Sequence, residues 1–476
     1  MAKFNQTTST RTANNEGHAA YSMQPKAKLI TQVLCSFFDE EKFYSKSDKN
    51  DICETVKSVI KSDPQFVSNL AVFARREFNM RSVSHVLTGF LANVPEGKPY
   101  VKDTVRGVVL RGDDATEILS FYLSEFGKPI PNSLRRGLRD VLFTFDAYTL
   151  AKYKGEGHAV KMRDLMRICR PHPETPEQSE MWKQLLDGTL PTPLTWESEL
   201  SANGNNTATW EKLIDSGKLP YMATLRNLRN IVEANPSNLD KVLEKLSDPN
   251  AVRHSRQLPF RFLSAYRNLS AGAGKKVADA LEKAVEIACE NVPKLPGRTV
   301  IAVDTSGSMG NTISAKSEIR CCEIGMMLGV IANRICEDSI FYTFDNHIEE
   351  KRIPSANILY TTLHESAAGG GTNMNLPFEK MMKDKIHCDR IIVISDNMCN
   401  DHFWNEPVQV LADRYRNESG NNIWVHAIDL QGYGTQQFAG PKTNIIAGWS
   451  EKVFDFILLA EQGEGNLEKV IAKYTW

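Results

Sequence analysis

Several signals that would place a protein in a large functional class are absent from this chain of 476 residues. No run approaches the ~20 apolar residues that a membrane-spanning helix needs, so we expect no membrane partner. The first residues, MAKFNQTT, have no apolar core, so no secretory signal is expected. The nine cysteines include no C-x-x-C pair. We therefore expect reduced, mostly buried thiols and a cytoplasmic location.

Catalytic signatures are absent as well. Ser306 lies in D-x-S-x-S, not in the G-x-S-x-G of a nucleophile elbow. The glycines at 369–371 are not followed by the Gly-Lys-Ser/Thr of a phosphate-binding loop. The ten histidines are scattered, and no pair has zinc-ligand spacing with a cysteine pair. The sequence therefore predicts no catalytic residues and no enzyme.

Charge is unevenly distributed along the chain. The net charge of −1 is the balance of +7 over residues 1–300 and −8 over residues 301–476. A basic part joined to an acidic part suggests a different partner for each. Because the basic excess is mild, a polyanion would have to meet a local patch of positive charge.

Most of the chain shows a helical pattern. From Pro25, apolar residues recur at helical spacing, with short breaks at prolines. Successive amphipathic helices predict a helical-repeat domain over residues 21–292, although no tight internal repeat is visible. A polar, flexible arm is expected at 1–20. Residues 171–210 are rich in proline, and only Met181–Leu186 is predicted to be helical there. Pro293 and Pro296 mark a linker to a second domain at 296–476.

The second domain opens with a strand and an oxygen-rich turn. The β-branched run from Val300 to Val303 predicts a buried strand that ends at Asp304. Ser306 and Ser308 follow on a tight turn. One carboxylate and two hydroxyls suit a small, hard cation such as Mg²⁺. An ordinary turn that caps the next helix is an equally good interpretation of this stretch taken alone.

Two later stretches favour the metal. Thr372 follows the glycines at 369–371, and a second buried strand from Arg390 leads to Asp396. Together with the turn, these positions resemble the metal-ion-dependent adhesion site of von Willebrand factor A domains. The resemblance implies a doubly wound, Rossmann-like α/β sheet with Mg²⁺ or Mn²⁺ at its top. In that family the hydroxyls touch the metal, and the aspartates often act through water. The implied metal-site residues are Asp304, Ser306, Ser308, Thr372 and Asp396.

Basic residues cluster in the helical part. Four groups lie on successive helices: Arg75, Arg76 and Arg81; Arg135, Arg136 and Arg139; Lys161, Arg163, Arg167 and Arg170; and Arg253, Arg256, Arg261 and Arg267. The spacing predicts that Arg163, Arg167 and Arg170 share one helix face. Any single group is most simply a solvated surface. Four groups together suggest contact with phosphates.

The helical part carries a second resemblance. The segments KLPYMATLRNLRN at 218–230, SRQLPFRFLSAY at 255–266 and GTLPTP at 188–193 look like the module shared by telomerase, Ro and vault proteins. Followed by an A-like domain, the chain resembles the Ro autoantigen family. That resemblance implies a ring of HEAT-like helical repeats. It also implies Y-like RNA on an outer surface, and single-stranded ends of misfolded RNA in a central hole.

Carried over by position, the resemblance assigns the two kinds of RNA contact to different residues. Lys161, Arg163, Arg167 and Arg170 match the segment around the hole, although the family often has a histidine near the place of Arg170. Arg135, Arg136 and Arg139 fall on the outer surface. Two alternatives remain open: a protein-binding scaffold that captures a partner's carboxylate through the metal, and a metal-dependent nuclease. A monomer and an exoribonuclease partner are also expected.

Overall fold

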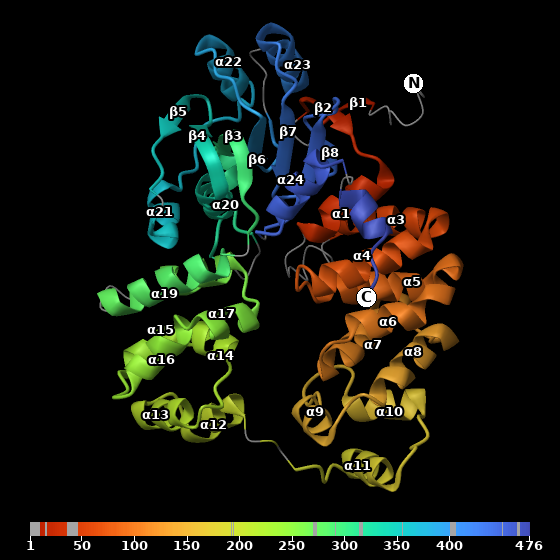
Figure 1. Cartoon of the computed structure of the whole chain (residues 1–476). Coiled ribbons are helices and arrows are strands. Elements are labelled where there is room, and N and C mark those ends of the chain that lie inside the picture. Colours follow the sequence, from red (N-terminus) through yellow and green to blue (C-terminus); the bar gives the residue numbers. More distant parts are fainter. Residues whose placement is uncertain are drawn as a thin grey trace. The chain divides into compact units, whose positions relative to one another are not determined.

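The computed structural model describes residues 10–14, 17–35, 46–191, 193, 195–269, 274–290, 292–313, 318–354, 356–399, 406–449, 451–463 and 467–476. The chain forms two compact units (Figure 1). The helical unit comprises residues 25–194 and 467–476, and the sheet unit comprises residues 1–24 and 195–466. Among the described residues, no helix combines the length and the apolar composition that crossing a membrane requires.

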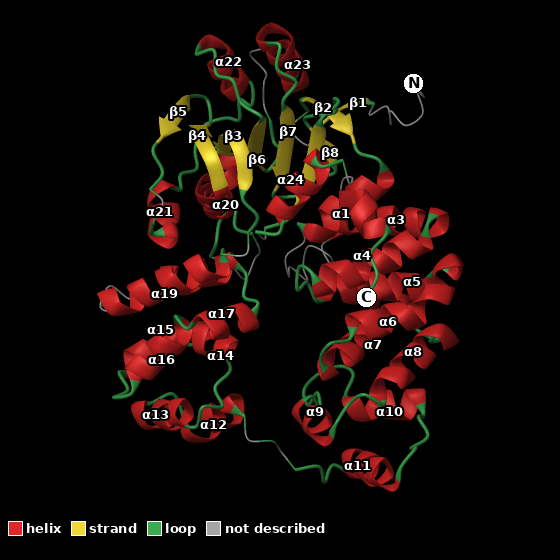
Figure 2. Ribbon diagram, in the orientation of Figure 1, coloured by secondary structure: helices red, strands yellow, loops and turns green. Residues whose placement is uncertain are grey.

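The helical unit consists of short helices packed in succession (Figure 2). Neighbouring helices bury the apolar residues that recur along each of them, which confirms the expected helical pattern. Helix α4 begins where Asp63 accepts a hydrogen bond from the Phe66 amide at 3.1 Å, with Pro64 in the first turn. The elements are α1 (Pro25–Leu34), α3 (Lys46–Ser62), α4 (Pro64–Arg76), α5 (Ser82–Asn93), η1 (Pro95–Tyr100), α6 (Val101–Val108), α7 (Gly112–Phe126), α8 (Asn132–Leu142), α9 (Ala147–Lys152), α10 (Met162–Cys169), α11 (Pro176–Asp187) and α25 (Leu467–Ala472).

The sheet unit holds a six-stranded sheet in the order β5-β4-β3-β6-β7-β9. All neighbours are parallel except β5, which is antiparallel to β4. The strands of the unit are β1 (Arg11–Ala13), β2 (Ala19–Ser22), β3 (Leu295–Asp304), β4 (Cys336–Phe344), β5 (Ile348–Lys351), β6 (Arg390–Ser395), β7 (Trp424–Asp429), β8 (Thr435–Gln436) and β9 (Thr443–Ala447). The predicted doubly wound α/β class is confirmed, including the buried strands β3 and β6 at the centre of the sheet.

Helices cover the sheet and extend the unit. Those that precede β3 are α12 (Trp196–Asn203), α13 (Thr207–Asp215), α14 (Tyr221–Arg226), α15 (Leu228–Ala234), α16 (Leu239–Leu246), α17 (Pro249–Ser255), α18 (Pro259–Arg267) and α19 (Lys275–Ala288). Those that follow are η2 (Gly307–Gly310), α20 (Cys321–Ile335), α21 (Ile358–Glu365), α22 (Leu376–Lys383), α23 (Val408–Ser419) and α24 (Val453–Glu461). Helix α20 packs on β3, β4 and β6 with an almost fully buried surface.

The compact units divide the chain differently from the segments 21–292 and 296–476. Helices α12–α19 belong with the sheet because buried polar contacts join them to it. Glu282 of α19 accepts hydrogen bonds from the Leu359 and Tyr360 amides at 3.0 and 2.8 Å, and so caps α21. The Arg267 guanidinium of α18 pairs with the Glu323 carboxylate of α20. The closure of the helical repeats into a ring stays a prediction.

Two expectations about irregular segments are wrong. The arm at 1–20 is partly ordered: β1 pairs with β2, and β2 pairs with β8 through Tyr21 and Ser22. The short edge strand β8 supplies backbone partners that the sequence does not reveal. The proline-rich stretch 171–210 holds α12 as well as the predicted α11. Helix α12 buries none of its residues, so it has no apolar period, and its signal is the Thr195–Ser198 cap.

A buried ion network ties the start of β6 to α24. Arg390 donates from Nε to Glu461 Oε1 at 2.6 Å, and His426 Nε2 lies 3.0 Å from the same oxygen. Burial would raise the pKa of Glu461, but hydrogen bonds from His426 and Arg390 lower it to about 2. The ionised carboxylate therefore stabilises the fold at neutral pH.

We expect Glu461→Gln to lower the free energy of unfolding by about 3 kcal/mol at pH 7, because Arg390 loses its buried counter-ion. A carboxylate whose pKa is lowered stabilises above its unfolded-state value and loses that contribution as pH falls. The difference between wild type and variant, measured by urea unfolding, should therefore shrink below pH ~4.5 and vanish near pH ~2. A difference independent of pH would show that the carboxylate acts only through packing.

Candidate functional site

The predicted metal-site residues gather at the carboxyl end of the sheet. Asp304 ends β3, and Asp396 directly follows the adjacent parallel strand β6. The carboxylate of Asp304 accepts hydrogen bonds from the Ser306 amide at 2.8 Å and from the Ser395 hydroxyl at 2.5 Å. Parallel strands place such residues side by side, which is why ligands of open α/β sheets collect there.

The hydroxyl ligands come from two loops held against each other. Ser306 Oγ and Ser308 Oγ lie 3.3 Å apart on the turn after β3. The Gly307 amide donates to the Gly370 carbonyl at 3.0 Å, and the Gly369 amide donates to the Thr305 carbonyl at 2.9 Å. These bonds bring the loop that carries the buried Thr372 to the turn. The structure thus brings together the two segments that the sequence paired.

The electrostatics of this group suit a cation. Burial, together with repulsion from Asp396, raises the pKa of Asp304 to about 7. Two fully buried carboxylates close to each other are costly unless a positive charge lies between them. The donor set of carboxylate and hydroxyl oxygens fits Mg²⁺ or Mn²⁺. Within the described part of the chain, no cluster of three His, Cys, Asp or Glu side chains could hold a metal.

Sequence reasoning missed a third buried carboxylate. Asp429 ends β7, next to β6, and its Oδ1 accepts from the Gln431 and Gly432 amides, both at 2.9 Å. Burial raises its pKa to about 6, and Asp396 adds to the repulsion. The signal was available, because the apolar strand 424–428 ends on an acidic residue just as the strands before Asp304 and Asp396 do.

The arginines of α8 form the first basic surface. Arg136 is exposed and makes no hydrogen bond or ion pair with the described residues. Arg135 donates to the Asn132 side chain. Arg139 is half-buried and contacts Asp140 at 3.3 Å, a carboxylate that it shares with Lys102. The outward-facing charge of α8 is therefore carried mainly by Arg135 and Arg136.

The second basic surface lies on α10. Lys161 caps this helix, and its ammonium group is paired with Glu156 at 2.7 Å. Arg163 and Arg167 lie one turn apart; Arg167 lies 3.9 Å from the Asp164 carboxylate, and the charge of Arg163 acts on the Glu156 carboxylate. The predicted common helix face does not extend to Arg170, because α10 ends at Cys169. Arg170 itself adopts a left-handed conformation with φ 47°.

The two basic surfaces meet at the end of α10. Burial raises the pKa of the Cys169 thiol to about 12, and the positive charges of Arg135 and Arg139 oppose that rise. The charges of Arg135 and Arg139 on α8 therefore act on Cys169, the residue that precedes Arg170. The sequence predicted two separate groups of charges. Arg170 directly follows α10, where that helix packs on α8, so it lies at the boundary between the two groups, whereas Arg163 and Arg167 lie within α10.

In the other two basic groups, several arginines already have carboxylate partners. Arg75 and Arg81 bind the buried carboxylate of Asp114 at 3.0 and 2.8 Å, together with His85 at 3.1 Å. Burial alone would raise the pKa of Asp114, but these three partners hold it well below its usual range. In the fourth group, the Arg253 guanidinium pairs with Glu290. The expectation that all four clusters face phosphates is therefore wrong for Arg75 and Arg81, which bind the buried Asp114.

Comparison with known proteins accounts for both halves of the chain. A model of the TROVE domain matches residues 14–189 and 186–276, and a model of the Ro60 vWA domain matches residues 298–431. The chain belongs to the Ro family of TROVE-domain proteins. The Ro resemblance drawn from the sequence motifs is therefore confirmed.

Individual relatives agree with this assignment. Telomerase protein component 1 of Rattus norvegicus is 27% identical over 336 residues, which cover 52% of this chain and 13% of that protein. RNA-binding protein RO60 of Deinococcus radiodurans is 24% identical over 470 residues, 86% of each chain. The crystal structure of the Deinococcus radiodurans Ro (RSR) protein matches with a TM-score of 0.63, 19% identity, and coverage of 94% of this chain and 99% of that one.

Proposed function

We propose that this Ro-family chain is an RNA-binding protein with two kinds of RNA contact. The α8 surface, defined by Arg135, Arg136 and Arg139, would hold a small structured noncoding RNA of the Y type. The α10 surface, defined by Lys161, Arg163, Arg167 and Arg170, would take the single-stranded ends of misfolded RNAs. Relatives named RNA-binding protein RO60 in Deinococcus radiodurans and Caenorhabditis elegans support this assignment.

One observation carries the proposal. Arg135 and Arg136 of α8, Arg167 of α10 and the adjacent Arg170 are exposed, whereas Arg75 and Arg81 bind the buried Asp114. The Arg136 side chain has no hydrogen-bonding or ion-pair partner in the described part of the chain. A lysine or arginine that meets a phosphate adds affinity by releasing a counter-ion. The arginines that are available for RNA are therefore those that the family resemblance selects.

The carboxyl end of the sheet would serve a different partner. Asp304, Ser306, Ser308, Thr372 and Asp396 would hold Mg²⁺ or Mn²⁺. When bound, that ion would offer an open coordination position to a carboxylate of a partner protein, such as an exoribonuclease. In this reading the chain is a scaffold that brings RNA and a processing enzyme together, and it has no catalytic activity of its own.

A second candidate function is a protein-binding scaffold without RNA. The three buried carboxylates Asp304, Asp396 and Asp429 favour it, because like charges buried at one end of the sheet are stabilised by a bound cation. The two functions respond differently to solution conditions. RNA held through several phosphates should dissociate steeply as salt rises. Capture of a carboxylate should depend on Mg²⁺ or Mn²⁺.

Sequencing of copurified RNA tests the proposal most directly. The protein, tagged at its amino end, should recover small structured RNAs and 3′-extended or misfolded noncoding RNAs above the level of a variant with Arg135, Arg136, Arg163 and Arg167 changed to Glu. Equal recovery from both proteins would overturn the RNA-binding proposal. The same preparation tests two further expectations, a monomer by light scattering and a cytoplasmic location by fractionation.

A further inference from the structure

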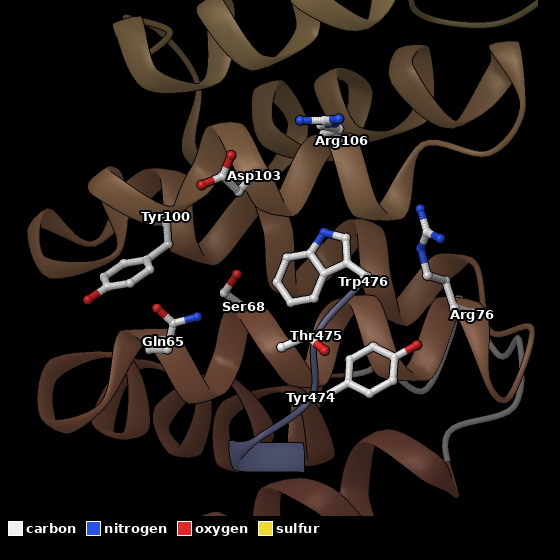
Figure 3. A pocket seen from close by; sticks show the side chains of 9 residues that line it. All are labelled: Gln65, Ser68, Arg76, Tyr100, Asp103, Arg106, Tyr474, Thr475 and Trp476. Atoms are coloured by element: carbon white, nitrogen blue, oxygen red, sulfur yellow. The ribbon is translucent and has the colours of Figure 1, made fainter. Parts of the chain in front are cut away.

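A pocket of about 510 Å³ opens on the helical unit between α4, η1, α6 and the segment 474–476 (Figure 3). Tyr100 lies on one side of the hollow and the indole of Trp476 on the other. Asp103 lies at its upper rim, and Ser68 and Gln65 lie below. None of the motifs found in the sequence covers these residues. Two aromatic rings facing a common space, with polar groups between them, resemble a site for a flat polar ring.

The wall formed by segment 474–476 is firmly anchored. The buried Asn69 side chain donates to the carbonyls of Ile471 and Ala472 at 3.0 and 3.1 Å. The Tyr474 hydroxyl donates to the Glu77 carboxylate at 2.9 Å, and burial raises the pKa of Tyr474 to about 12, which keeps it a donor.

The Tyr474 ring in turn supports the indole. It packs edge-on against Phe73 and stacks on Trp476 with ring centroids 6.2 Å apart and an interplanar angle of 24°. Trp476 remains 41% exposed in spite of these contacts. Its indole is therefore a supported aromatic surface that is open to a ligand.

The polar groups favour one kind of ring. Asp103 is exposed, and no hydrogen bond or ion pair engages its side chain among the described residues. A carboxylate accepts hydrogen bonds and does not donate them. Guanine presents two adjacent donors, N1–H and the N2 amino group, whereas cytosine, adenine and uracil each present only one donor group on that edge. A carboxylate beside a stacking surface therefore selects guanine.

Two arginines can meet a phosphate at the same place. Arg76 donates from Nε to the Gly107 carbonyl at 3.0 Å, which fixes its guanidinium while its terminal amino groups remain available. Arg106 is exposed and has no ion pair within the described part of the chain. Both groups line the pocket near Trp476 (Figure 3). Phosphate on arginine and base on an aromatic ring are the two halves of nucleotide recognition.

From this geometry we infer that the pocket binds a single guanine nucleotide, whether free or as an unpaired residue of an RNA. The base would stack on Trp476 and Tyr100 and pair with Asp103, and the phosphate would contact Arg76 and Arg106. The inference that the pocket binds an unpaired guanine of an RNA rests on the proposed function. The inference that it binds a free guanine nucleotide does not depend on that function.

The test with free nucleotides uses the full chain, tagged at its amino end. In a ligand-observed NMR titration, GMP should bind about tenfold more tightly than CMP. Trp476→Leu should weaken GMP binding about tenfold through the lost stacking. Asp103→Asn should weaken GMP binding but leave CMP binding unchanged. Trp196→Leu, a half-buried tryptophan of the sheet unit, is the matched control and should bind as wild type does.

Equal binding of GMP and CMP, or no effect of Trp476→Leu, would overturn the inference. Circular dichroism melting separates lost binding from lost folding, and Asp103→Asn covers the case in which the tryptophan variant does not fold. In the RNA test, a single-stranded oligonucleotide with one guanine should lose affinity with either variant. If both variants bind that oligonucleotide normally while Arg163→Glu/Arg167→Glu does not, the pocket fails as an RNA site and the proposed function stands.

Discussion

Replacing Asp304 by alanine is expected to abolish the binding of Mn²⁺ while leaving the fold intact. The Asp304 carboxylate lies at the centre of the five oxygen-bearing residues and has no substitute among the serines. The fold should survive because Asp304 and Asp396 are buried like charges that repel each other, so the loss of one removes a cost. Mn²⁺ titrations followed by electron paramagnetic resonance should show one bound ion in the wild type and none in the variant.

Thermal unfolding supplies an independent measurement of the same effect. A ligand present at 100 times its dissociation constant stabilises the native state by about 2.7 kcal/mol. Mn²⁺ should therefore raise the melting temperature of the wild type but not that of Asp304→Ala. The matched control is Asp338→Ala, near the amino end of β4, which removes the same charge from the other end of the sheet. Mn²⁺ binding in Asp304→Ala at the wild-type affinity would mean that the site is wrongly placed.

The second large effect is a separation of RNA contacts between α10 and α8. Arg163→Glu/Arg167→Glu should weaken the binding of a structured RNA with a single-stranded 3′ tail far more than the binding of the same RNA without the tail. Single strands are held through phosphates and through stacking on arginine planes, with little sequence preference. Filter binding of the two RNAs, side by side, measures the difference.

Arg135→Glu/Arg136→Glu on α8 should weaken the binding of both RNAs to the same degree, because a folded RNA is recognised by shape and phosphate contacts. Each lost phosphate contact should lower the slope of log affinity against log salt by about one unit. Arg170 is left unchanged because it lies at the boundary of the two surfaces.

The control for both pairs is Arg229→Glu/Lys241→Glu, which makes the same change of charge in the sheet unit at residues already close to carboxylates. It should have little effect on either RNA. If the substitutions at both arginine pairs reduce the affinity for both RNAs equally, only a general polyanion-binding surface remains, and the two-site model must be abandoned.

Local pattern was sufficient for the parts of the molecule whose signal lies within a few consecutive residues. The β-branched runs that lead to Asp304 and Asp396 predicted two central strands, and both are confirmed. Apolar spacing predicted the helices of residues 25–169 for the same reason, since burial of one face imposes a period on the sequence. The candidate metal-site residues came from the resemblance to A domains, and the parallel strands β3 and β6 place Asp304 and Asp396 at one edge of the sheet.

Other features depend on partners far away in the chain. Strands β1 and β2 form a sheet with β8, because β2 pairs with that strand more than 400 residues later in the chain. No local sequence pattern predicts such a partner. Helix α12 buries no side chain, so it has no period to detect. The arginine groups looked alike in sequence. Only the structure shows that Arg75 and Arg81 bind Asp114, whereas Arg136 and Arg167 are exposed to solvent.

The sequence by itself thus determined the family and the fold class of each half, because these are recorded in short motifs and in periodicity. Tertiary structure alone decided which charged side chains are paired in the interior and that Trp476 lines a pocket with Tyr100. Each of these features depends on contacts between residues that are far apart in the chain. Burial and pairing at those distances, rather than residue type, fix whether a side chain serves the fold or a ligand.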